Sequence, residues 1–110
     1  MKRLFAALVL FLAHMGSAYA CMTSEQLLAN AERAKIPTTV LVGPQLKQAA
    51  EIIAAVAPID AGAIGFVALS DVPDGSGVVS VGSPGHVCGY MVLQERDYRI
   101  LQTTLFGRTA

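Results

Sequence analysis

Residues 38–69 read TTVLVGPQLKQAAEIIAAVAPIDAGAIGFVAL, and their pattern points to the architecture of the chain. Thr38 to Val42 is rich in β-branched side chains and predicts a buried strand. The apolar residues that follow recur on one helical face, and Pro58 closes that helix. Ala63 to Leu69 is a continuous apolar run, typical of a strand covered on both faces. The order strand, helix, strand predicts one right-handed parallel crossover.

The segment before this unit has the features of a helix start. Thr23 and Gln26 stand in the spacing of a capping box, in which each residue satisfies a free backbone N–H of the other. An apolar face follows, formed by Leu27, Leu28, Ala31 and Ala34. These features predict a helix over residues 24–35, ended by Pro37.

Downstream of the unit, turns and short strands alternate. Turn residues at 71–77 precede a strand at 78–81, and turn residues at 82–85 separate that strand from one at 86–93. Residues 99–106 fit two structures, since Tyr98, Leu101 and Leu105 have helical spacing whereas the Thr103-Thr104 pair favours a strand. We adopt the strand.

The predicted fold class is therefore α+β, in the order α-β-α-β-β-β-β. Two helices pack on a mixed sheet of four to five strands, with one parallel crossover followed by an antiparallel meander. The 90 residues that follow position 20 of the 110-residue chain suffice for a single small domain, at 21–110.

Residues 1–20 have the pattern of a cleavable secretory signal peptide. Lys2 and Arg3 precede an apolar run over 4–13, and the small residues Ala18 and Ala20 flank the expected cleavage site. The run has ten residues, whereas a membrane-spanning helix needs about 20. We expect a periplasmic or secreted product without a transmembrane span.

A cysteine directly after the cleavage site resembles the bacterial lipoprotein signal, in which that cysteine is acylated. The residues before Cys21 depart from that signal, because Ala18 stands where leucine is usual and Tyr19 where a small residue is usual. Lipid anchoring at Cys21 is the less favoured alternative.

The charge of the mature chain excludes some partners. Six Lys and Arg stand against eight Asp and Glu in residues 21–110, a net charge of −2. A basic patch for nucleic acid and a polybasic membrane tract are therefore not expected. No cofactor is predicted, and the partner, protein or small molecule, is not identified by the sequence.

The two cysteines, Cys21 and Cys88, are predicted to form a disulfide that holds the N-terminus on the sheet. Two alternatives use the segment His86-Val87-Cys88-Gly89-Tyr90-Met91 instead. Cys88 with His86 as its base could serve as a thiol nucleophile. His86, Cys88 and Met91 could also hold a soft metal such as copper, because thiolate and thioether ligands select such ions.

The prevailing hypothesis is a non-enzymatic accessory or binding protein, since both cysteines have a structural use and catalytic groups do not converge. Recognition is expected at the loops 71–77 and 82–86, because binding residues often lie on loops of a rigid scaffold. The candidate residues there are Asp71, Asp74, Ser83 and His86.

Overall fold

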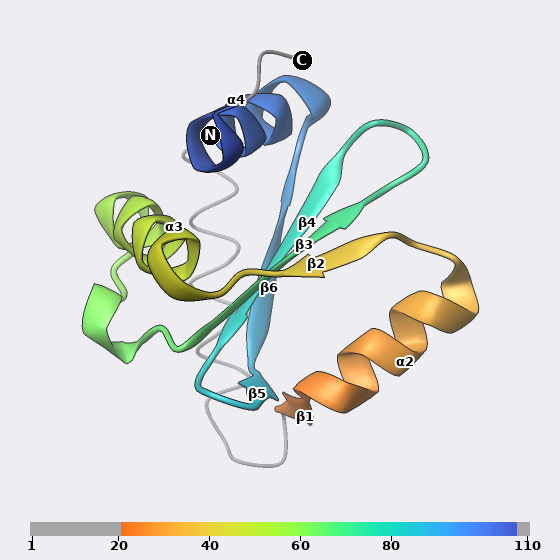
Figure 1. The fold of residues 1–110 in the computed structure, drawn as a ribbon, viewed down its shortest axis with the longest axis horizontal. Coiled ribbons are helices and arrows are strands. Elements are labelled where there is room, and N and C mark those ends of the chain that lie inside the picture. Colours follow the sequence, from red (N-terminus) through yellow and green to blue (C-terminus); the bar gives the residue numbers. More distant parts are fainter. Residues whose placement is uncertain (1–20, 108–110) are drawn as a thin grey trace.

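A computed structural model of the protein describes residues 21–107. The signal peptide predicted at 1–20 lies outside the described residues. Four strands form a sheet in the order β2-β3-β4-β6, and two shorter strands, β1 and β5, form a separate pair. Helices α3 and α4 lie on one side of the sheet and α2 lies on the other (Figure 1). The α+β fold class is confirmed.

The helices and strands have the following bounds. The four-stranded sheet contains β2 (Thr38–Val40), β3 (Phe66–Asp71), β4 (Gly77–Gly82) and β6 (Gly89–Leu93). The two-stranded pair contains β1 (Met22–Thr23) and β5 (His86–Val87). The helices are α2 (Ser24–Ala34), α3 (Gly43–Val56) and α4 (Glu95–Phe106), with a short 3-10 turn, η2 (Ala61–Ala63).

Helix α2 begins as its sequence predicts. The Thr23 hydroxyl accepts a bond from the Gln26 backbone N–H, and the Gln26 side chain accepts one from the Thr23 backbone N–H. The helix ends at Ala34, where Lys35 adopts a left-handed conformation and donates its N–H to carbonyls of the last turn. The predicted capping box is confirmed, and the helix is one residue shorter than expected.

The predicted parallel crossover is wrong. Strands β2 and β3 pair antiparallel, with Thr38 opposite Ser70 and Val40 opposite Ala68. Helix α3 has 14 residues and is about 21 Å long. Residues 57–65, which include η2, then lead the chain back to the end of the sheet where α3 began. Because this return has no regular secondary structure, the apolar pattern of the sequence does not reveal it. All strand pairs of the four-stranded sheet are antiparallel, so the sheet is not mixed as predicted.

Residues 99–106 form a helix and not the predicted strand. They belong to α4, whose Tyr98 and Leu105 are buried against the sheet. Thr104 is accommodated because its hydroxyl donates a hydrogen bond to the Ile100 carbonyl one turn earlier. Gly107, in the left-handed region, ends the helix. The domain therefore has three α-helices in its described part.

The two faces of the sheet are covered unequally. Alternate residues of β3 point to opposite faces, so Val67 and Leu69 join the larger core under α3 and α4, and Phe66 and Ala68 join a smaller cluster on the α2 side. Every side chain of α2 remains at least partly exposed. Burial of apolar surface stabilises by about 25 cal/mol per Å². Because α2 buries no side chain fully, it is held on the sheet more weakly than α3 and α4.

A disulfide between Cys21 and Cys88 attaches this weaker layer to the sheet, as predicted. The Cα atoms of the two residues are 4.3 Å apart. Just beyond the bond, Met22 pairs with Val87 and Thr23 with His86, which joins β1 to β5. The bond thus fixes the chain immediately before α2 to the point where β5 meets β6.

Candidate functional site

Sequence analysis places its thiol and metal alternatives in the segment 86–91, and the fold puts the side chains of this segment in different surroundings. His86 is exposed, and its Nδ1 lies 3.3 Å from the Pro84 carbonyl oxygen. The sulfur of Cys88 is bonded to that of Cys21. Met91 lies in the larger core with 6% of its surface exposed. In this state neither a thiolate at Cys88 nor an accessible thioether at Met91 is offered to a substrate or an ion.

Asp71, at the start of the predicted recognition loop 71–77, makes an internal contact with α4. Tyr98 of α4 donates its hydroxyl to an Asp71 carboxylate oxygen at 2.6 Å, and the amide of Gln102 donates to the same oxygen at 3.5 Å. Burial raises the pKa of Tyr98 well above its ordinary value, and the hydrogen bond to Asp71 and its negative charge add to the rise. Asp71 thus positions α4.

Asp74 closes the turn at the tip of the same loop. Its carboxylate accepts hydrogen bonds from the Ser76 backbone N–H at 2.9 Å and from the Ser76 hydroxyl at 2.6 Å. These bonds, the hydroxyl first, hold the pKa of Asp74 below its ordinary value. In the other predicted loop, Ser83 and His86 are exposed, and Gly85 accepts a hydrogen bond from the Ser24 backbone N–H. Ser83 and His86 close the turn of this second loop, because the His86 backbone N–H donates to the Ser83 carbonyl at 3.0 Å, and both residues are exposed.

A groove between α3 and α4, which sequence analysis does not predict, has a strongly apolar lining. Its volume is about 240 Å³. Residues of α3 and α4 form its walls and residues of β6 its floor, namely Ile52, Ile53, Val56, Met91, Leu93, Asp97, Ile100, Leu101 and Thr104. We call it the α3–α4 groove.

The rims of the α3–α4 groove carry exposed apolar side chains. Val56 of α3 is 44% exposed and Ile100 of α4 is 54% exposed. On α4 the lining residues are 97, 100, 101 and 104, which is the spacing of one helical face. That spacing is visible in the sequence, and the strand prediction for 99–106 concealed it.

One charged group lies in this apolar lining, the partly exposed carboxylate of Asp97. Arg96, the neighbouring residue, is exposed. Arg99 is bound elsewhere, since its guanidinium pairs with Glu95 at 2.7 Å one turn away. The groove therefore combines an apolar hollow, apolar rims and a single acid, with a base beside it.

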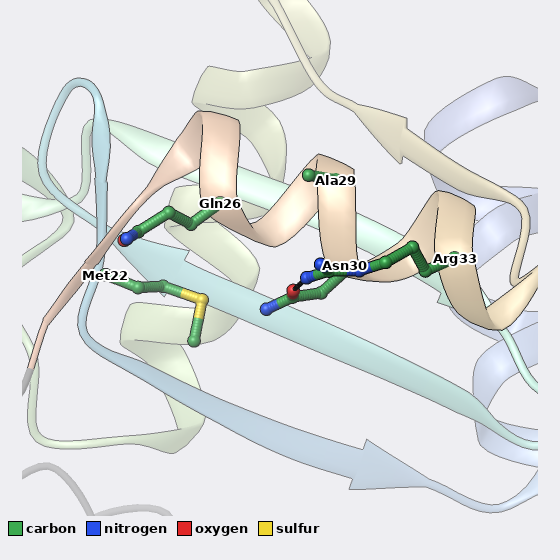
Figure 2. Close-up of a pocket in the computed structure, with 5 residues that line it drawn as sticks. All are labelled: Met22, Gln26, Ala29, Asn30 and Arg33. Carbon is green, nitrogen blue, oxygen red and sulfur yellow. Dashed lines mark hydrogen bonds between the residues drawn. The ribbon is translucent and has the colours of Figure 1, made fainter.

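A second hollow, of about 330 Å³, lies beside α2 (Figure 2). Met22 lies next to side chains that project from α2, and the polar ones are engaged locally. Gln26 completes the capping box, and Arg33 donates a hydrogen bond to Asn30. A third hollow, of about 430 Å³, lies between η2 and the first half of α3 and contains both Lys47 and Glu51. Neither has an apolar lining like that of the α3–α4 groove.

Comparison with known proteins identifies no relative: no family model, curated protein or solved structure matches the chain. Within residues 21–107, no three His, Cys, Asp or Glu side chains gather as ligands for a metal ion. The helices of this same part are too short or too polar to cross a bilayer. The properties of the site therefore come from its geometry alone.

Proposed function

We propose that this chain is an exported, disulfide-stabilised binding protein without catalytic chemistry of its own, and that the α3–α4 groove docks a protein partner. The observation that carries the proposal is the exposure of Val56 and Ile100 at the rims of an apolar hollow. Contiguous apolar surface rimmed by polar residues is a feature of protein interaction sites.

The size of the groove favours a protein over an enclosed small molecule. Small-molecule pockets usually enclose about 300–1,000 Å³, and this groove measures about 240 Å³. A hollow of that volume accepts one or two anchoring side chains of a partner, while the open rims contact the surface around them. Anchors of this kind contribute most of the binding energy at protein interfaces.

The disulfide supports export as part of the proposal. Structural disulfides persist outside the reducing cytoplasm, in the periplasm or beyond the cell. With Cys21 and Cys88 bonded, the sulfur that a thiol enzyme or a soft-metal site would need is already used. We therefore prefer binding to either alternative.

Site-specific photo-crosslinking tests the docking function in cells that export the protein. A photoreactive phenylalanine derivative replaces Ile100 in one variant and Val56 in another. Because both side chains are exposed at the rims, the probe should fit without disturbing the core. We expect discrete covalent adducts of defined mass with both variants after irradiation.

The matched control places the same probe at Leu28 of α2, which is apolar, 40% exposed and remote from the groove in sequence and layer. Few or no adducts are expected there. Adducts of equal yield at Leu28, or none at Ile100 and Val56, would contradict the proposed docking surface.

A further inference from the structure

We propose that the partner docked by the α3–α4 groove is a second copy of this chain, so that the exported protein forms a twofold dimer through α4. This inference rests on the proposed function and names its partner. A twofold interface uses the same patch on both subunits, so the patch must be complementary to itself. The surface around α4 has this property in shape and in charge.

The shape carries both halves of an apolar contact. Ile100 projects from α4 with 54% of its surface exposed, and the hollow that would receive such a side chain lies directly beside it. One copy can therefore offer its Ile100 to the hollow of the other and receive the other's Ile100 in return. Each contact occurs twice in the dimer, which doubles the apolar surface removed from water.

The charges match in the same way. Asp97 lies in the groove and Arg96 lies next to it on α4. Neither residue has an ion-pair partner among the residues that the structure describes. The ion pair seen on this helix joins Arg99 to Glu95. With the twofold axis close to these two residues, an antiparallel crossing of the α4 helices brings Arg96 of each copy to Asp97 of the other.

The net charge of the chain permits this association. A net charge of −2 over residues 21–110 produces little repulsion between copies. An unrelated partner would need to supply both an exposed apolar side chain and a basic side chain. A second copy has both, in Ile100 and Arg96. The patch is limited to parts of two short helices and one strand, so we expect a reversible dimer that depends on concentration.

Sedimentation equilibrium of the exported, disulfide-bonded protein over a range of concentrations tests the inference. We expect a monomer–dimer equilibrium whose dissociation constant rises at least about tenfold in Ile100→Glu, because the charge would be buried in an apolar contact. Leu28→Glu, an equivalent change on α2, is expected to leave the constant unchanged. A protein that is monomeric at every concentration would overturn the inference.

A charge swap provides a second test that does not depend on the core. Arg96→Glu and Asp97→Arg should each weaken the dimer several-fold, since each places like charges together. The double variant Arg96→Glu/Asp97→Arg should restore the wild-type constant. Failure of the double variant to restore dimerisation would contradict the proposed crossing.

The two proposals fail in different ways. If the purified protein is monomeric and the Ile100 crosslink captures a different protein, docking in the groove stands and the dimer is wrong. If the protein is monomeric and the groove positions yield no adduct, both are wrong. An adduct of twice the chain mass, absent at Leu28, supports both.

Discussion

At the scale of single residues, the contact between Tyr98 and Asp71 determines how α4 lies on the sheet. Tyr98 is 3% exposed, and its hydroxyl is satisfied by an exposed carboxylate at 2.6 Å. A buried hydroxyl without a partner would cost about 1–3 kcal/mol. The interaction therefore removes a penalty and also orients the helix, so Asp71 has a structural role. The recognition role predicted for this exposed residue stays a prediction.

The raised pKa of Tyr98 makes the stability of the protein depend on alkaline pH. The folded state favours the protonated phenol, so this contribution is fully present below the ordinary tyrosine pKa of about 10 and is lost as the pH rises above that value. We expect the free energy of unfolding to fall above pH 10 in the wild type and to fall less in Tyr98→Phe. Urea unfolding at a series of pH values measures both slopes.

Asp71→Asn is the companion variant for this prediction. It keeps an oxygen that can accept the hydrogen bond and removes the negative charge, so the tyrosinate absorbance of Tyr98 should titrate at a lower pH than in the wild type. Burial, the first cause of the shift, is unchanged, and the return should be partial. Identical pH slopes in the wild type and Tyr98→Phe would show that Tyr98 does not titrate as inferred.

At the scale of elements, the sequence predicts local structure better than it predicts how elements meet. The α2 cap and the proline-bounded α3 depend on neighbouring residues, and both are confirmed. The pairing of β2 with β3 depends on the path of residues 57–65, which no periodicity describes. Parallel and antiparallel pairing then remain equally compatible with the apolar runs, and the prediction of a crossover was wrong.

The candidate site could not be predicted for a related reason. The groove requires α3 and α4 side by side, and residues 99–106 were assigned to a strand on the strength of Thr103-Thr104. Both threonines are exposed in the helix, so neither has to fit into the core, and their preference for strands does not decide the structure. The buried Tyr98 and Leu105, seven residues apart, carry the stronger helical signal.

The docking of α4 also depends on the absence of a side chain at Gly77. A Cβ at this position would lie 2.1 Å from Cδ1 of Tyr98, far closer than packed atoms allow. Because Tyr98 is buried, its ring cannot move away freely, and we expect Gly77→Ala to lower the free energy of unfolding by about 1–3 kcal/mol. Urea unfolding followed by circular dichroism measures the loss.

Gly62→Ala is the control for this substitution, since a Cβ there would lie 3.6 Å from the nearest atom, an ordinary contact. Its stability should remain within about 0.5 kcal/mol of the wild type, as for most surface changes. Equal stabilities of Gly77→Ala and Gly62→Ala would mean that the Tyr98 ring does not rest on Gly77.

At the scale of the whole molecule, the disulfide joins two parts that hydrophobic burial holds unequally. The layer of α3 and α4 contains most of the core, whereas α2 contributes no fully buried side chain. Cys21 and Cys88 are 67 residues apart in sequence, so the bond closes most of the described chain into one loop. A small domain of this kind has a net free energy of unfolding of only about 5–15 kcal/mol. The stabilisation from a disulfide that constrains the unfolded state is therefore a large part of the total.

Replacing either cysteine with serine should therefore destabilise the protein to the same extent. In the chain-entropy model a loop of this length contributes about 4 kcal/mol, and Cys21→Ser and Cys88→Ser each remove that same bond. Urea unfolding should show equal losses in the two variants, and the double variant should lose no more than either one. Reductant should lower the wild type to the level of the variants and leave the variants unchanged. Unequal losses, or a reductant effect on a serine variant, would show that the two sulfurs do not stabilise the fold as a pair.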